Sequence, residues 1–323
     1  MIEKDAKVYV AGHRGLVGSA ILRRLEGMGF ERLITRTHGE LDLSRQAEVE
    51  GFFESERPDY VFLAAARVGG ILANSTYPAD FIRDNLQIQT HVIDAAYRAG
   101  VKKLLFLGSS CIYPRDCPQP MKEEYLLSGP LEPTNEPYAV AKIAGIEMCR
   151  AYNRQHGTRF VSVMPTNLYG PGDDFDLEHS HVLAALVRKF CDAEAAGAGS
   201  VTVWGTGSPR REFLHVDDMA DACVFVMEQY EGDGILNIGT GKDMTIQELA
   251  GLIRDVSGFE GEIRFDPARP DGTPQKLLDV SRLASLGWRS RISLREGIEA
   301  TCRWYRENVG AGPGGASMPR EGS

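Results

Sequence analysis

The first half of the chain alternates short, almost uncharged apolar runs with longer segments in which apolar residues recur every three or four positions. The apolar runs predict buried strands at 7–11, 32–35, 59–66, 103–110 and 159–163. The periodic segments predict helices at 15–28, 44–55, 81–99 and 138–156. Short apolar strands separated by helices are typical of a parallel sheet covered on both faces. We therefore expect an α/β protein built on a doubly wound parallel Rossmann sheet.

The pattern becomes less regular after about residue 170. It still predicts helices at 182–193, from 216 onward and at 245–256, a strand in the run ILNIGTG (235–241), and a polar loop over WGTGSPRREF (204–213). We expect residues 1–170 to form mainly the Rossmann domain that binds the dinucleotide. Residues 171–308 would form mainly a smaller C-terminal substrate-binding lobe, with some chain crossing back. The Gly- and Pro-rich tail, 309–323, is expected to be disordered.

Composition places the chain among ordinary globular proteins, with 43% hydrophobic and 25% charged residues in a length of 323. No apolar run approaches the roughly 20 residues of a membrane-spanning helix, and the N-terminal segment shows no secretory signal core. The net charge of −9 argues against nucleic acid as a partner, because such binding needs a basic surface. Six scattered cysteines without a CxxC pair indicate reduced thiols, not disulfides or a zinc site. We expect a cytoplasmic protein with no metal and no membrane partner.

A glycine-rich turn follows the first predicted strand and leads into the first predicted helix. Its residues, GHRGLVG, are Gly12, His13, Arg14, Gly15, Leu16, Val17 and Gly18. Glycines in such a turn let the backbone approach a pyrophosphate, which then lies at the helix N-terminus. An ordinary Gly-rich turn would read similarly, and the spacing is G-x-x-G-x-x-G, not G-x-G-x-x-G. The strand–turn–helix context favours a dinucleotide site.

The end of the second predicted strand indicates which dinucleotide binds. An NAD enzyme usually has an acidic residue there for the ribose hydroxyls, whereas this strand leads into Arg36, Thr37 and His38. Arg36 together with Arg14 suits the 2′-phosphate of NADP, unless Arg36 is a solvated charge at the strand end. Asp42 follows at a distance suitable for the adenine edge. We therefore expect NADP(H) as the cofactor.

The stretch YAVAK (138–142) is the candidate catalytic turn. In a helix, Tyr138 and Lys142 lie on one face. A lysine ammonium beside a phenol lowers the phenol pKa and favours a tyrosinate near neutral pH, and the same lysine can hold the nicotinamide ribose. An amphipathic helix with a surface lysine would share this spacing. The upstream glycine turn and the strand-terminal Ser109 favour the catalytic interpretation.

The Tyr-x-x-x-Lys pair, the upstream serine and the glycine turn resemble those of the extended short-chain dehydrogenase/reductase superfamily. Within it, the chain resembles the GDP-L-fucose synthases over about residues 7–306, in the stretches GHRGLVGSAI, AAARVGGILANSTYPADFI, LLFLGSSCIYP, EPTNEPYAVAKIAG, SVMPTNLYGP, SHV, REFLHVDDMA and PDGTPQKLLDVSRL. The resemblance implies an NADPH-dependent enzyme. It would epimerise C3 and C5 of GDP-4-keto-6-deoxy-D-mannose and reduce C4, giving GDP-L-fucose.

The resemblance also implies the catalytic roles. Ser109 and Tyr138 would hold the C4 oxygen, with Lys142 completing the set. Cys111 would be the base that removes the C3 and C5 protons, and His181 of SHV the acid on the opposite face. Ser109 and Cys111 point to the same side if the strand continues to its tip. Without the resemblance, Cys111 would count as a small buried hydrophobe, and spacing does not separate His181 from His179.

Two sets of binding residues follow from the resemblance as well. The cofactor set joins the glycine turn, Arg36 and Asp42 with Leu107, Gly108, Ser109, Ser110, Tyr138, Lys142, Pro165, Thr166, Asn167, Leu168 and His181. The substrate set is Asn167, Lys189, Trp204, Arg211 and Asp271. Tryptophan can stack on a base and arginine can pair with a pyrophosphate, whereas we interpret Arg210 as a solvated charge.

The nearest alternative is another nucleotide-sugar epimerase/reductase, 4-epimerase or 4,6-dehydratase of the same superfamily. A dehydratase would be expected to carry an Asp-Glu pair where this chain has Ser110-Cys111. A non-catalytic NADPH-binding regulator would be expected to have a damaged Ser-Tyr-Lys set, which is intact here. Superfamily members often dimerise through two long helices, here 81–99 and 138–156, so we expect a homodimer. Neither the oligomeric state nor the exact GDP-hexose follows from the sequence alone.

Overall fold

The computed structural model describes residues 2–177, 180–269 and 271–310. His179 and the tail from residue 311 onward, which we expected to be disordered, lie outside the described residues. Val309 and Gly310, the first residues of that expected tail, form a turn after the last helix. Within the described ranges, no helix is long and apolar enough to cross a bilayer.

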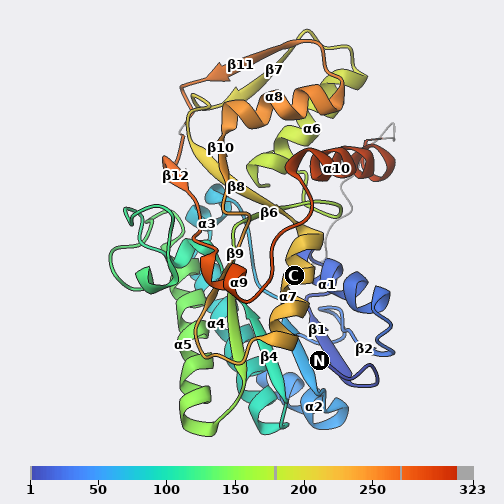
Figure 1. Ribbon diagram of the computed structural model, residues 1–323, viewed down its shortest axis with the longest axis vertical. Coiled ribbons are helices and arrows are strands. Elements are labelled where there is room, and N and C mark those ends of the chain that lie inside the picture. Colours follow the sequence, from blue (N-terminus) through green and yellow to red (C-terminus); the bar gives the residue numbers. More distant parts are fainter. Residues whose placement is uncertain (1, 178–179, 270, 311–323) are drawn as a thin grey trace.

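A six-stranded parallel sheet forms the centre of the larger part of the molecule (Figure 1). Its strands are β1 (Lys7–Ala11), β2 (Arg32–Ile34), β3 (Tyr60–Leu63), β4 (Lys103–Leu107), β5 (Phe160–Pro165) and β9 (Leu236–Ile238). They lie in the order β2-β1-β3-β4-β5-β9, and every neighbouring pair is parallel. The predicted Rossmann sheet is confirmed. Its strand order reverses between β1 and β3, the place where open α/β sheets bind ligands.

Helices cover both faces of this sheet, as its nearly uncharged strands require. The helices α1 (Leu16–Gly27) and α7 (Val216–Gln229) pack on one face. The other face is covered by α2 (Gln46–Glu56), α4 (Pro78–Arg98) and α5 (Glu136–His156). The short helix α3 (Ile71–Thr76) precedes α4, and two 3-10 turns, η1 (Ser110–Ile112) and η2 (Glu123–Tyr125), lie between β4 and α5.

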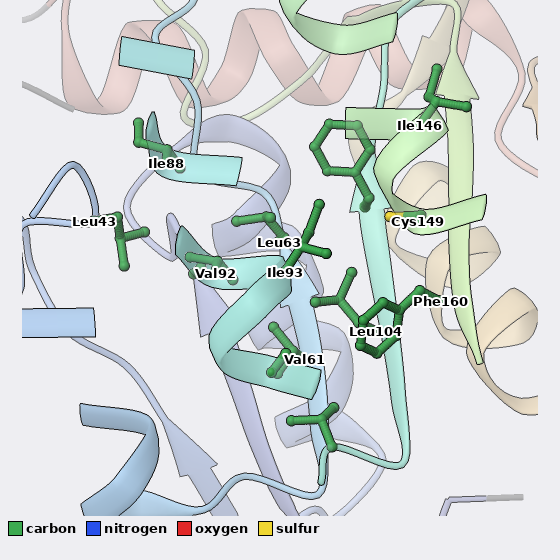
Figure 2. Close-up of a cluster of buried hydrophobic side chains, with 14 of the residues drawn as sticks. Leu43, Val61, Leu63, Ile88, Val92, Ile93, Leu104, Ile146, Cys149 and Phe160 are labelled. Atoms are coloured by element: carbon green, nitrogen blue, oxygen red, sulfur yellow. The ribbon is translucent and has the colours of Figure 1, made fainter. Parts of the chain in front are cut away.

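Figure 2 shows the core between the sheet and the helices α4 and α5. The labelled side chains are Leu43, Val61, Leu63, Ile88, Val92, Ile93, Leu104, Ile146, Cys149 and Phe160. Full burial of a Val, Leu, Ile or Phe side chain contributes about 1.5–3 kcal/mol to folding. This core fixes α5 against β4, and α5 carries the candidate tyrosine and lysine.

A smaller second lobe has its own core, at the top of Figure 1. Its helices are α6 (Val182–Ala195), α8 (Ile246–Ser257) and α10 (Leu294–Asn308), and its strands are β7 (Ser200–Trp204) and β11 (Glu262–Asp266). The Thr245 hydroxyl accepts from the Glu248 N–H, and the Glu248 carboxylate accepts in return from the Thr245 N–H. The predicted threonine cap of α8 is therefore confirmed as a full capping box.

Four further strands lie between the two parts: β6 (Asn167–Tyr169), β8 (Arg210–His215), β10 (Asp243–Thr245) and β12 (Gln275–Lys276). Strand β8 pairs with the other three. The polar loop predicted over 204–213 is wrong at both ends, because Trp204 ends β7 and Arg210 begins β8. Polar side chains at 210–212 concealed this strand, since their partners are distant in sequence.

The chain crosses back from the second lobe to the sheet. Helix α7 packs on α1, and β9 pairs with β5. The short helix α9 (Ser281–Ser285) then packs against β9. Residues 216–238 and 281–285 thus lie with the Rossmann sheet, although they follow residue 171.

Candidate active site

The glycine turn between β1 and α1 forms a cradle that side chains would fill. Gly12 has a left-handed φ of 82°, and a Cβ on it would lie 2.7 Å from the Ala65 nitrogen. A Cβ on Gly18 would lie 2.1 Å from the Gly12 oxygen, so the helix could not pack on the turn. Gly15 is the N-cap of α1, and no side chain caps this helix. The cradle at this helix N-terminus fits the pyrophosphate of a dinucleotide.

Two guanidinium groups lie near the end of β2. Arg36 pairs with the Glu56 carboxylate at 2.6 Å, and Arg14 is exposed on the glycine turn. Hydrogen bonds from Thr37 and, more weakly, the charges of Arg36 and Arg14 lower the pKa of Glu40, so both cations lie near this carboxylate. Two adjacent guanidinium groups fit a 2′-phosphate. Asp42 accepts hydrogen bonds from the Ser44 N–H and hydroxyl at 2.9 and 2.6 Å, which hold it in a local turn.

Strand β4 ends sooner than predicted, and its end positions Ser109 and Cys111. Strand geometry stops at Leu107, and the 3-10 turn η1 begins at Ser110. The Ser109 Oγ caps this turn by accepting the Cys111 N–H at 3.3 Å. The two residues are therefore brought together by a capped turn, and the strand alternation that we expected is wrong. A Cβ on Gly108 would lie 2.4 Å from the Met164 sulfur, which explains a glycine at the strand tip.

Lys142 lies one turn after Tyr138 on α5 and points to the tip of β4. Its Nζ is buried and donates a hydrogen bond to the Leu107 carbonyl oxygen at 2.8 Å. It also lies 5.7 Å from the centroid of the Tyr138 ring. Burial lowers the pKa of the Lys142 ammonium to about 8, and the nearby Cys111 opposes this shift. The tertiary fold thus joins the end of β4 to the YAVAK turn.

The Tyr138 ring is nearly perpendicular to the Phe81 ring, with centroids 6.3 Å apart, and its phenol forms a hydrogen bond with the Ser109 hydroxyl. Burial raises the pKa of Tyr138, Cys111 raises it further, and the hydrogen bond with Ser109 opposes the rise. This direction is opposite to the one expected from the Tyr-Lys spacing, because burial dominates and the ammonium is bound at the Leu107 carbonyl. The phenol is therefore kept protonated, as a proton donor must be.

Cys111 lies beside this group and is only 9% exposed. Burial raises the pKa of its thiol, while Ser109, Lys276 and Lys142 lower it, in that order. Lys276 belongs to β12, where it pairs in register with Arg211 of β8. The sequence analysis missed Lys276 as a partner of Cys111. Lys276 lies in PDGTPQKLLDVSRL, a stretch that carries the family resemblance, and this position could have indicated a role for it.

His181 immediately precedes α6 and is its N-cap residue, with an extended backbone. Its side chain reaches solvent, but the protein around it lowers the pKa of the imidazole, and Asp174 opposes this shift. Within the described part of the chain, the imidazole forms no hydrogen bond or ion pair with Cys111 or Tyr138. The structure therefore brings together Ser109, Cys111, Tyr138 and Lys142, with His181 on a separate element.

The expected nucleotide-binding residues lie around the segment that joins β7 to β8. Trp204 ends β7 and is 45% exposed, and the Lys189 Nζ lies 5.1 Å from its ring centroid. Burial lowers the pKa of Arg211, and the neighbouring Asp271 opposes this. The Asp271 carboxylate accepts from the Thr206 N–H and hydroxyl at 2.7 and 2.8 Å. An exposed indole with cations around it is suited to a nucleoside diphosphate.

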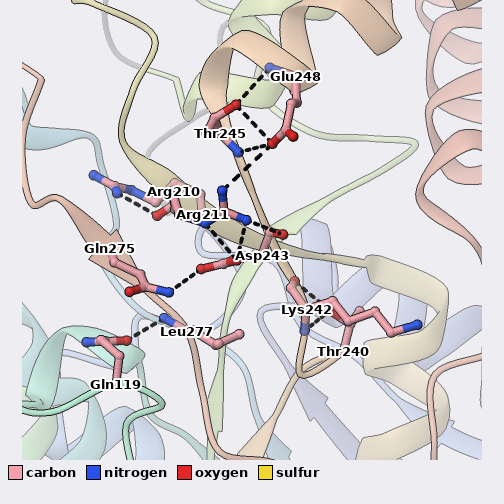
Figure 3. Close-up of polar contacts among 10 residues, drawn as sticks. All are labelled: Gln119, Arg210, Arg211, Thr240, Lys242, Asp243, Thr245, Glu248, Gln275 and Leu277. Carbon is pink, nitrogen blue, oxygen red and sulfur yellow. Dashed lines mark hydrogen bonds and ion pairs between the residues drawn. The ribbon is translucent and has the colours of Figure 1, made fainter.

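Arg210 and Arg211 have different surroundings, as Figure 3 shows. Arg210 pairs with Asp243 at 2.8 Å, and Asp243 also accepts from Gln275 at 2.5 Å. Arg210 is therefore a structural charge that joins β8 to β10, where we had expected a solvated one. Arg211 donates to the Arg210 carbonyl oxygen at 2.8 Å.

Glu212, next to Arg211, is a buried carboxylate that the sequence analysis missed. It is 0% exposed, and it accepts from the N–H groups of Thr240, Gly241 and Leu278 at 2.6, 2.7 and 2.9 Å. Its carbonyl oxygen accepts from the Asn167 amide at 2.8 Å. Glu212 thus joins β6, the β9–β10 turn and the segment that carries Lys276. A Glu in a polar run gave no sign of this role.

All six cysteines are free thiols. Among the residues that the structure describes, no group of three or more His, Cys, Asp or Glu side chains is placed to hold a metal ion.

Comparison with known proteins finds a matching family, similar sequences and similar solved structures. Residues 8–239 match the NAD dependent epimerase/dehydratase family. The chain is 63% identical over 309 residues to putative GDP-L-fucose synthase 2 of Arabidopsis thaliana, covering 96% of this chain and 94% of that protein. It is 56% identical over 311 residues to GDP-L-fucose synthase of Escherichia coli (strain K12), covering 94% and 97%. A GDP-L-fucose synthetase from Naegleria fowleri, solved with NADP bound, is similar in structure with a TM-score of 0.88 at 28% identity, covering 95% of this chain and 96% of that one.

Proposed function

Because the chain belongs to the NAD dependent epimerase/dehydratase family, and within it to the GDP-L-fucose synthases, we propose that it converts GDP-4-keto-6-deoxy-D-mannose into GDP-L-fucose with NADPH. The observation that carries this proposal is the capped turn that holds the Cys111 thiol beside Ser109 and Tyr138. Reduction of a ketone needs the hydroxyl, the phenol and the lysine. A thiol in the same group adds the base that epimerisation requires.

Epimerisation depends on the ketone at C4, which makes the protons on C3 and C5 acidic. Cys111, as a thiolate, takes one of these protons, and the electron pair moves onto the C4 oxygen to form an enolate. Ser109 and Tyr138 donate hydrogen bonds to that oxygen and stabilise its charge. His181 then donates a proton to the carbon from the opposite face, which inverts the centre.

The thiolate and the imidazolium are both minor forms near neutral pH. Burial raises the pKa of Cys111 and lowers the pKa of His181. Lys276 and Lys142 favour the thiolate, and Asp174 favours the imidazolium. These neighbours increase the fraction of the protein in which both groups carry the charge that epimerisation needs.

Reduction uses the same oxygen-binding pair. NADPH, when bound, supplies the hydride that reduces C4. Tyr138 donates its phenolic proton to the C4 oxygen, while Ser109 holds that oxygen in place. The tyrosinate that remains attracts the Lys142 ammonium, which lies 5.7 Å from the centroid of the Tyr138 ring. The glycine turn from Gly12 to Gly18 would bind the cofactor pyrophosphate, and Arg14 and Arg36 its 2′-phosphate.

We also propose that the GDP moiety binds at Lys189, Trp204, Arg211 and Asp271, with the sugar bordered by Asn167. In support, the Trp204 ring is open to solvent and the Arg211 guanidinium lies close to Asp271. Residues 1–170 would bind mainly cofactor, and 171–308 mainly substrate.

We further propose that the protein is a cytoplasmic homodimer whose subunits meet through α4 and α5. These are the longest helices of the described chain, at 21 residues each, and α5 leaves the apolar Val140 39% exposed. Size-exclusion chromatography with light scattering tests the dimer, and a charged residue in place of Val140 should produce monomers if this face is the interface.

The function is tested with purified protein, GDP-4-keto-6-deoxymannose and NADPH. NADPH absorbance should fall, and the product should be GDP-L-fucose with inverted C3 and C5. Consumption of NADPH with retention at both centres would indicate a reductase of another GDP-hexose. Binding of NADPH without consumption would indicate a regulator on the same fold.

A further inference from the structure

Two cations lie over the exposed ring of Trp204, and one of them belongs to neither expected binding set. The Lys189 Nζ is 5.1 Å from the ring centroid. The Arg269 guanidinium carbon is closer, at 4.8 Å. Arg269 is itself exposed.

The pairing of β7 with β11 places Arg269 there. Trp204, the last residue of β7, pairs in register with Asp266, the last residue of β11. The Asp266 carbonyl oxygen accepts from the Gly205 N–H at 2.9 Å and from the Arg269 N–H at 3.2 Å. The turn after β11 therefore brings Arg269 across the end of β7. Lys189 arrives from α6 and donates to the Thr202 carbonyl oxygen at 3.0 Å.

This arrangement concentrates positive charge, and the one carboxylate described beside it, Asp271, accepts its hydrogen bonds from Thr206. In the described ranges, no carboxylate oxygen lies within 4.0 Å of the charged nitrogens of Lys189, Arg211 or Arg269. Neighbouring arginines do have such partners: Arg210 pairs with Asp243, and Arg264 with Glu262. Burial and then the charge of Arg269 lower the pKa of Lys189, which shows that the two cations repel each other. In a chain of net charge −9, such a cluster is suited to an anionic ligand.

We propose that Arg269 is a further cation of the substrate nucleotide site, where it binds the diphosphate and leaves the Trp204 ring when the base stacks there. This inference rests on the proposed function only in taking the ligand to be a nucleoside diphosphate. A base that stacks on Trp204 needs a ring face that Arg269 and Lys189 now occupy. The displaced guanidinium can bind phosphate oxygens in a bidentate manner, which relieves its repulsion with Lys189.

Binding of GDP and of guanosine tests this inference. It is measured by calorimetry and by tryptophan fluorescence in the wild type, Arg269→Gln and Arg264→Gln. Arg264→Gln is the matched control, because Arg264 is exposed on the same β11 segment and pairs with Glu262. Loss of one charge-assisted phosphate contact should weaken GDP binding roughly five- to tenfold in Arg269→Gln. Arg264→Gln should bind GDP like the wild type. Guanosine has no phosphates and need not displace Arg269 in Arg269→Gln, so it should bind that variant at least as tightly as the wild type.

Salt gives a second measurement. Affinity for GDP should fall less steeply with ionic strength in Arg269→Gln than in the wild type. Wild-type affinity of Arg269→Gln for GDP, or an equal loss for guanosine and GDP, would overturn the inference, because the phosphates would then play no part in the role of Arg269. These measurements need no turnover. A protein that shows this Arg269 dependence but forms no GDP-L-fucose would contradict the proposed reaction and still support the site.

Discussion

The Oγ atom of Ser109 accepts a hydrogen bond from the backbone N–H of Cys111 at 3.3 Å. In a continuous strand, the Cα atoms of residues i and i+2 would lie about 6.6 Å apart. The capped turn instead holds the Ser109 hydroxyl and the buried Cys111 thiol together beside Tyr138. In the proposed reaction, the groups for epimerisation and for reduction therefore lie at one site.

Cys111→Ser should abolish epimerisation while leaving the reductive group intact. A serine hydroxyl is far too weakly acidic to replace a thiol as the base. Exchange of the C3 and C5 protons with deuterated solvent should fall by at least about two orders of magnitude, while NADPH binding stays unchanged. The measurement is deuterium incorporation by mass spectrometry, in parallel with NADPH oxidation. His181→Asn is the companion variant, and it should keep some exchange but stall inversion. Native exchange rates in Cys111→Ser would mean that the base lies elsewhere.

Tyr138→Phe should nearly abolish reduction. The change removes the proton donor to the C4 oxygen, a loss of roughly 10²- to 10⁴-fold in rate. NADPH affinity should change little, which fluorescence titration of the cofactor can check. Reduction at close to the native rate would contradict the catalytic role of the phenol.

Arg36→Gln should weaken NADPH binding much more than NADH binding. The variant removes a cation beside the proposed 2′-phosphate and leaves Glu56 without its 2.6 Å partner. Arg32→Gln is the matched control and should affect neither cofactor, because Arg32 is exposed at the opposite end of β2 from Arg36. Dissociation constants for both cofactors decide the matter, and an equal loss for the two would exclude a role in reading the 2′-phosphate.

Lys276→Met should shift the pH dependence of proton exchange to higher pH. Lys276 lowers the pKa of Cys111, so its loss raises that pKa, and more alkaline solution is needed to form the thiolate. On the rising limb of the profile, the rate should fall about tenfold for each unit of the shift. Lys242→Met, an exposed lysine in the β9–β10 turn, should leave the profile in place. A lower plateau at an unchanged pH midpoint would point to substrate contact as the role of Lys276.

Glu212→Gln should loosen the connection between β8 and the segment after β12. The amide nitrogen of glutamine cannot accept the hydrogen bond that the Leu278 N–H donates to the carboxylate. A buried donor is then left unsatisfied, which should lower the free energy of unfolding by about 1–3 kcal/mol. KM for the nucleotide sugar should rise, because Arg211 and Lys276 both depend on this connection. Denaturant unfolding and steady-state kinetics give the two values. Glu260→Gln, at an exposed site, should change neither.

Strands and helices of the Rossmann sheet could be predicted because their periodicity is set by local burial. The same holds for the glycine turn, whose spacing reflects the contact between Gly12 and Gly18. The sequence predicted that Ser109 and Cys111 lie together, but not why. A side-chain cap ends the strand early, and no local pattern indicated it. Strand β8 and the roles of Glu212, Lys276 and Arg269 could not be predicted. Their partners lie tens of residues away in the sequence, and polar residues in these segments predict a loop.

His181 is the N-cap residue of α6, and Lys189 lies about two turns further along this helix, roughly 12 Å away at the helical rise per residue. A helix is stiff over that length, so its two ends move together. In the proposed reaction, binding of the nucleotide therefore helps to position the sugar and the acid. Binding of the phosphates at Lys189 would hold α6 in place, and with it the backbone of His181, so a sugar without GDP would lose turnover as well as affinity. The energy of holding the part of the substrate that does not react is thereby converted into rate at the part that does.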